Sequence, residues 1–175
     1  MRQLILWLLL ATPAHATSFR ITTLFHPHIK LGQTGLEVRA DLIPNAPLAI
    51  LELGGLGSKE LEVAPALGWD FQTNGPVISL RLSPRHGKFW GWVDFELEPK
   101  SWGLYWLIQV QYTISPWLHV GFEEESWGEL TAAGPLRHGG GPNLLFEIGK
   151  ARIDLVLQIH TACQPEIVLR WHWFF

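Results

Sequence analysis

The chain has 175 residues, enough for one domain that buries a sizeable core. It is 47% hydrophobic and 17% charged, it holds ten tryptophans, and its formal net charge of −3 argues against a nucleic-acid partner. Cys163 is the one cysteine, so no internal disulfide forms. Beyond the first residues, no apolar stretch approaches the 18 residues that indicate a membrane-spanning helix.

The start of the chain predicts a secretory signal peptide. Arg2 provides the positive charge, residues 4–10 form a short apolar core, and Ala14-His15-Ala16 is a small-residue cleavage pattern. The alternative, an N-terminal membrane anchor, needs about 20 apolar residues. We therefore expect residues 1–16 to be removed by cleavage after Ala16.

Ten segments of alternating polarity follow, and turn residues separate them. This rhythm predicts β-strands and no helix. The predicted strands are residues 36–43, 47–55, 61–72, 76–82, 89–98, 102–114, 117–127, 143–149, 152–160 and 165–175. Residues 19–25 are a candidate eleventh strand.

Charge falls on one side of these predicted strands. In residues 89–98, Val93 and Phe95 alternate with Asp94 and Glu96, and nearly every acidic strand residue follows that parity, with Glu124 as the clear exception. A soluble β-sandwich also alternates in this way. The bulk of the apolar face, and aromatic residues near strand ends, favour the aromatic girdles of a membrane barrel. Those aromatic residues are Phe89, Trp90, Trp92, Trp102, Trp117, Trp127, Trp171, Trp173 and Phe175.

The final stretch, PEIVLRWHWFF, carries apolar side chains at every second position and ends in phenylalanine. It resembles the C-terminal strand of bacterial outer-membrane β-barrels. The resemblance implies an insertion signal read by the barrel assembly machinery, formed here by Ile167, Leu169, Trp171, Trp173 and Phe175. It also implies a location in the outer membrane, with outer-membrane lipids as partners and no cofactor.

The expected fold is therefore all-β, an antiparallel up-and-down transmembrane β-barrel of about ten strands, with eight to twelve compatible. Residues 34–175 would form the barrel, and residues 17–33 an N-terminal periplasmic segment, a plugging segment or an extra strand. Bacterial single-chain barrels have even strand numbers. With the last strand ending in the periplasm, the longest loop, residues 128–142, would lie outside as a flexible loop.

The polar parity predicts the residues that line the lumen. Their charges either pair as a plug, because an unpaired buried charge is costly, or line a narrow pore that favours cations. The expected function is thus a structural or narrow porin-like barrel with a mostly acidic lumen, and small ions or solutes are its partners if it conducts. The lumen candidates are Glu37, Arg39, Asp41, Glu52, Glu62, Asp70, Arg81, Asp94, Glu96, His119, Glu123, Glu125, Glu147, Asp154, His160, Glu166, Arg170 and His172.

Two other functions remain open: a barrel enzyme that acts on lipid, and a secreted soluble β-sandwich that binds a ligand. His119, Glu123 and Glu125 share a strand face and could form a metal site or the histidine–carboxylate half of a hydrolase. A serine partner is missing, because Ser126 has the opposite parity and Ser79 lies three strands away. No catalytic and no metal-binding residue is therefore assigned.

Overall fold

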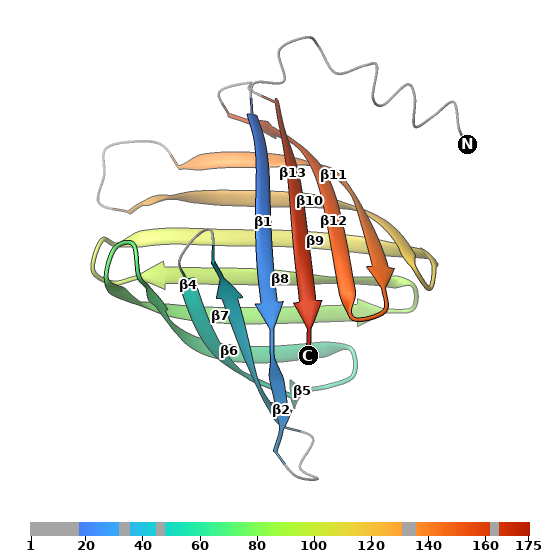
Figure 1. Ribbon diagram of the computed structural model, residues 1–175, viewed down its shortest axis with the longest axis horizontal. Helices are drawn as coiled ribbons and strands as arrows, with labels where there is room; N and C mark the ends of the chain where they lie inside the picture. The colour runs from blue at the N-terminus through green and yellow to red at the C-terminus, as the bar shows by residue number, and fades with distance from the viewer. Residues whose placement is uncertain (1–17, 32–35, 45–47, 131–135, 162–164) are drawn as a thin grey trace.

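The computed structural model describes residues 18–31, 36–44, 48–130, 136–161 and 165–175, and all regular structure in them is β (Figure 1). No helix in this part of the chain is long and apolar enough to cross a membrane. The expected signal peptide and Cys163 lie outside the described residues. The strands are β1 (Ser18–His26), β2 (His28–Lys30), β3 (Glu37–Ile43), β4 (Leu48–Gly54), β5 (Leu56–Gly57), β6 (Leu61–Asp70), β7 (Gly75–His86), β8 (Phe89–Glu98), β9 (Gly103–Ser115), β10 (Leu118–Glu129), β11 (Arg137–Ile148), β12 (Ala151–His160) and β13 (Pro165–Phe174).

Within the described residues, eleven of these strands close into one barrel, while β2 and β5 pair at its edge. From β3 to β13, wall strands that are adjacent in the chain pair antiparallel. The predicted all-β barrel of about ten strands is confirmed. The described strands belong to a single closed sheet, so the sandwich alternative has no support.

Strand β1 closes the barrel in a way that differs from the expected all-antiparallel order. It runs parallel to β13, from the pair Ser18–Glu166 to the pair His26–Phe174, and Figure 1 shows the two arrows side by side. It also meets β3 at Phe25. Consecutive strands of an up-and-down barrel alternate in direction, so with eleven of them the first and last must point the same way.

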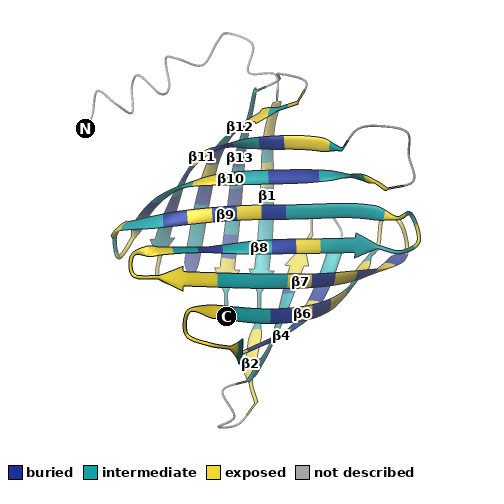
Figure 2. Ribbon diagram, turned by 180° about the vertical axis from the view of Figure 1, so that it is seen from behind, coloured by how far each residue is buried: buried dark blue, intermediate teal, exposed yellow. Residues whose placement is uncertain are grey.

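The barrel is polar inside and apolar outside. On β13, Arg170 and His172 are buried, whereas Trp173 is 38% exposed, and Phe175 just after the strand is 55% exposed. The same alternation of buried and exposed positions runs along the other strands in Figure 2. Large exposed apolar side chains include Phe19, Leu51, Leu67, Ile78, Phe95, Ile108, Val110, Phe122 and Ile159.

Strand β11 begins well before its predicted start, so the prediction of a flexible loop from Arg137 to Pro142 is wrong. The three consecutive glycines there belong to the sheet. A Cβ on Gly139 would lie 2.5 Å from the His160 ring, and one on Gly141 would lie 1.8 Å from a backbone oxygen. Glycine in a strand permits such close approach. At these glycines β11 therefore packs closely against the neighbouring strand β12.

Candidate functional site

The interior holds two groups of ion pairs. The first, here called the Arg170 cluster, consists of Arg170, Arg20, Glu123, Glu125 and Asp154. The Arg170 guanidinium donates to Glu123 at 2.6 Å and to Glu125 at 3.1 Å, and its Nη1 lies 3.6 Å from Asp154. Arg20 of β1 makes a second, bidentate contact with Glu125. The arginine–carboxylate fork geometry makes these contacts strong.

Neutral amides complete the Arg170 cluster. Gln109 donates to Glu123 at 2.8 Å and to Asp154 at 2.6 Å, while Gln158 donates to Glu123 at 2.7 Å and to Glu125 at 3.1 Å. All of these side chains are buried. Gln158 supplies the donor for Glu123 Oε1, an oxygen that neither arginine contacts among the described residues. A buried carboxylate is costly unless its oxygens are hydrogen-bonded.

The second group, the Arg81 cluster, consists of Arg81, Arg39, Asp41, Glu52 and Asp94. The Arg81 guanidinium donates to Asp94 at 2.6 Å, to Asp41 at 2.8 Å and to Glu52 at 3.0 Å. Arg39 lies 3.2 Å from Glu52. Four wall strands, β3, β4, β7 and β8, therefore meet through one guanidinium.

The edge of the Arg81 cluster includes Glu37 of β3 and Glu62 of β6. Arg39 donates to Glu62 at 2.5 Å and lies 3.6 Å from Glu37. His26 Nδ1 lies 2.5 Å from Asp41, and His26 Nε2 lies 2.9 Å from Nδ1 of His172. The His26–His172 pair joins β1 to β13 inside the closure.

A group of aromatic and charged side chains lies near the rim of the barrel where β13 ends. Arg152 donates to Glu147 at 2.7 Å, and its guanidinium lies over the rings of Trp90 and Trp92. Trp90 also packs edge-on against His119. Trp90 and Trp92 therefore face the interior, and their assignment to an outer aromatic girdle is wrong. Their parity, which they share with Asp94, indicates this.

The predicted His119–Glu123–Glu125 group does not assemble. His119 contacts Thr113 at 3.1 Å and lies 3.9 Å from Glu147, whereas Glu123 and Glu125 pair with Arg170. Residues at alternate positions of one strand share a face but are separated along it. In the described residues, no group of three or more histidine, cysteine, aspartate or glutamate side chains has a metal-binding arrangement.

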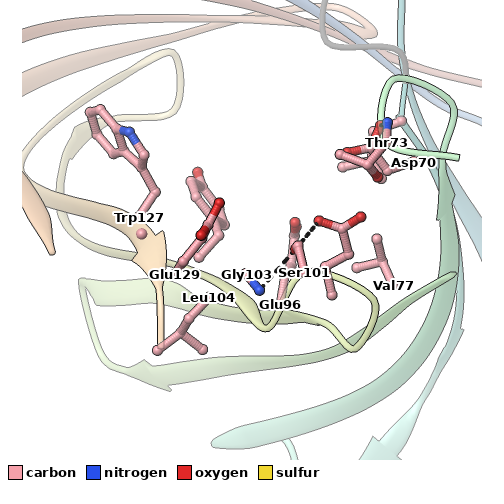
Figure 3. A pocket seen from close by; sticks show the side chains of 13 residues that line it. Asp70, Thr73, Val77, Glu96, Ser101, Gly103, Leu104, Trp127 and Glu129 are labelled. Carbon is pink, nitrogen blue, oxygen red and sulfur yellow. Dashed lines mark hydrogen bonds between the residues drawn. The ribbon is translucent and has the colours of Figure 1, made fainter. Parts of the chain in front are cut away.

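The opposite rim opens into a pocket of about 430 Å³, here called the vestibule (Figure 3). Its lining includes the carboxylates of Asp70, Glu96, Glu98 and Glu129. Tyr105 also lines it and donates to Glu125 at 3.1 Å. The vestibule thus ends on the Arg170 cluster, which lies beneath it.

Two further lumen candidates, His160 and Glu166, lie next to the vestibule. His160 lies 3.0 Å from Glu166 and packs edge-on against Trp127, which lines the vestibule. On the outer face of β13, Trp171 and Trp173 contact each other, and Phe175 stacks on Phe25 across the closure. The terminal strand therefore presents its apolar side chains to the surroundings.

Among the described residues, a cluster of polar side chains lies on the outer face of β10 and β11. Glu124, Ser126 and His138, here called the outward cluster, contact one another beside Trp106. The sequence pattern did not predict this cluster, because a serine partner was expected only on the strand face of His119. Glu124, Ser126 and His138 all lie at positions of their strands that are otherwise apolar. Polar residues at such positions could have indicated the cluster.

The interior network also contains residues that the pattern of charged side chains did not single out. Arg20 lies in residues 17–33, which were not assigned firmly to the barrel wall, and Gln109 and Gln158 are uncharged.

No protein-family model matches the chain, and no curated protein matches its sequence.

Proposed function

We propose that this protein is an outer-membrane β-barrel whose lumen is closed by its own ion pairs. Its partners are then outer-membrane lipids and, during biogenesis, the barrel assembly machinery. The observation that carries the proposal is the inverted polarity of the wall: large apolar side chains are exposed while carboxylates and arginines are buried.

Inverted polarity is costly in water and favourable in lipid. Exposed apolar surface costs about 25 cal/mol per Å² in water, and contiguous patches of it mark interaction surfaces. A closed barrel pairs the backbone groups of neighbouring wall strands with one another, as the hydrocarbon core requires, and here β1 completes the closure by meeting β3 at Phe25. Both properties support a wall that faces lipid.

Strand lengths support the same proposal. A transmembrane strand needs about 9–11 tilted residues, and the wall strands from β6 to β13 have 10 to 13. Strands β3 and β4 have seven each. A shorter wall on one side is accommodated by local thinning of the bilayer at modest cost.

Detergent requirement tests the location of the wall. We expect the protein to sediment with membranes, to need detergent for extraction, and to migrate faster on gels when it is not heated. Deleting Phe175 should lower the fraction assembled in cells, because the deletion removes the last residue of the expected insertion signal. A protein recovered folded in buffer without detergent would contradict the proposal.

Conductance tests the closed lumen. The Arg170 and Arg81 clusters occupy the interior with paired charges, so we expect no steady current in planar bilayers. The porin-like alternative predicts cation-selective current that falls when Asp94 and Glu96 are neutralised. Steady selective current through the wild-type protein would refute closure while leaving the membrane location intact.

A further inference from the structure

We infer that the outward cluster is a serine esterase site that cleaves ester-linked acyl chains of membrane lipids. The inference rests on the proposed membrane location, since the site faces the surroundings of the wall. Its starting point is an anomaly: a carboxylate, a hydroxyl and an imidazole gather on a face that is otherwise apolar.

The register of three strands brings the cluster together. Ser126 of β10 lies opposite His138 of β11 and opposite Trp106 of β9. Glu124 is two residues before Ser126, so it shares the outer face. Three consecutive strands therefore meet at a serine.

The contacts are those of a nucleophile with its base and an acid. Ser126 Oγ donates to Glu124 Oε1 and lies 2.6 Å from His138 Nδ1, so a rotation of the hydroxyl directs its proton to the imidazole. Glu124 Oε1 is 3.4 Å from His138 Nδ1, close enough to offset the charge of an imidazolium. The Trp106 indole N–H donates to Glu124 Oε2 at 2.7 Å and fixes the orientation of the carboxylate.

Burial distinguishes the serine from its partners. Ser126 is fully buried, whereas the side chains of His138 and Glu124 are 46% and 30% exposed. Because Ser126 is covered, an ester and then water reach the hydroxyl only where neighbouring side chains shift while the Ser126–His138 contact is kept. Serine hydrolases need a nucleophile and a base within hydrogen-bond reach, and this pair meets that requirement.

The height of the cluster on the wall selects the ester. His138 is the second residue of β11, and Ser126 lies three residues before the end of β10. At about 3.3 Å per residue, Ser126 lies roughly 10 Å from the end of β10 and His138 about 3 Å from the start of β11. In a bilayer that level is the boundary between headgroups and hydrocarbon, where acyl esters lie. Further along the same face, Phe122 and Ile108 are exposed and can contact the acyl chain.

The reaction needs only the lipid and water. Ser126 Oγ bonds to the acyl carbon as its proton passes to His138 Nδ1. The bond between that carbon and the lipid alcohol oxygen then breaks, and the alcohol takes the proton. Water next attacks the acyl-serine through the same base, which releases a fatty acid and restores the hydroxyl.

The test measures fatty-acid release by the full chain in vesicles. One arm contains diacyl phosphatidylethanolamine, a second adds a glycolipid with O-linked acyl chains, and a third contains an ether-linked phospholipid that has no acyl ester. We expect release in the first arm, the second, or both, which identifies the lipid source, and none in the third. Release at background level in both ester arms from folded wild-type protein would overturn the inference.

Variants assign the activity to the cluster. Ser126→Ala should lower the rate by at least about 10³-fold, His138→Gln by about 10²-fold or more, and Glu124→Gln by less than either. Ser79→Ala is the matched control, because Ser79 is buried on the interior face of β7, and it should leave the rate unchanged. Equal rates for wild type and Ser126→Ala would overturn the inference.

A second readout needs no variant. A fluorophosphonate ester should label wild-type protein, and peptide mass spectrometry should place the label on Ser126, whereas a label elsewhere would contradict the site. The gel shift of unheated samples reports separately whether each protein is a folded barrel. A folded but inactive wild type refutes the esterase site alone, and a detergent-independent protein refutes the membrane location.

Discussion

The Arg170 and Arg81 clusters both pair buried carboxylates with arginines, but their other hydrogen-bonding partners and their exposure differ. In the Arg170 cluster the Arg170 side chain is only 7% exposed, the second arginine, Arg20, is 34% exposed, and buried glutamines supply further donors. In the Arg81 cluster the side chains of Arg81 and Arg39 are both 22% exposed, and His26 contributes instead of amides. Of the two central arginines, Arg170 is therefore dry and Arg81 is partly hydrated.

Arg170→Met should give the largest loss of stability. Glu125 would keep Arg20, but Glu123 and Asp154 would keep only neutral amide donors in the described contacts. Removing one partner of a buried ion pair costs about 3–5 kcal/mol. Denaturant unfolding of the barrel in lipid vesicles, followed by tryptophan fluorescence, measures the change.

Arg81→Met should cost less, about 2 kcal/mol, because hydration screens this cluster. Glu52 would keep Arg39 and Asp41 would keep His26, so mainly Asp94 loses its partner. The double variant with Asp94→Asn should recover part of the loss. Equal unfolding free energies for Arg81→Met and Arg170→Met would remove the distinction between a dry Arg170 and a partly hydrated Arg81.

Arg85→Met controls both of these substitutions. Arg85 is exposed near the end of β7, so the same change of residue type should alter stability by less than about 0.5 kcal/mol. A loss as large as that of Arg81→Met would mean that arginine content, and not position, determines the effect.

Gln158→Leu should destabilise by about 1–2 kcal/mol, because Glu123 and Glu125 each lose a buried amide donor. The side chain is fully buried, and leucine has a similar size. Hydrogen–deuterium exchange should increase in β12 and β10. An unchanged unfolding free energy would show that the arginines alone stabilise the Arg170 cluster.

Lys100→Ala should have the smallest effect, below about 1 kcal/mol. Its ammonium donates to the backbone oxygens of Thr73 and Asn74 in an exposed turn near the vestibule, where water replaces lost donors. The same unfolding measurement applies. A loss larger than that of Gln158→Leu would mean that rim turns contribute more than interior amides.

Much of the wall could be predicted from alternation, because a strand with one polar and one apolar face repeats every two residues. The segment 89–98 coincides with β8. The start of β11 could not be predicted in this way, since glycines carry no side chain that shows a parity. The parallel contact of β1 with β13 depends on which distant strands meet, and local sequence does not encode this.

The candidate site, like the fold, could be predicted only in part from the sequence. The interior acids could be predicted from their parity, but which arginine pairs with which carboxylate depends on barrel closure and register. Glu124 was recognised as an exception to the charge pattern. Its link to Ser126 and His138 requires the register of β10 against β11, which becomes visible only in the folded sheet.

The parallel contact between β1 and β13 has a consequence for the order of folding. It joins the first and last wall strands of the chain, so it has the highest sequence separation of any wall contact. Contacts of this kind form late, because the entropy of closing the whole intervening chain opposes them. We expect β1 to remain accessible until β13 is in place, and its contacts with β13 to mark the last, rate-limiting step of folding.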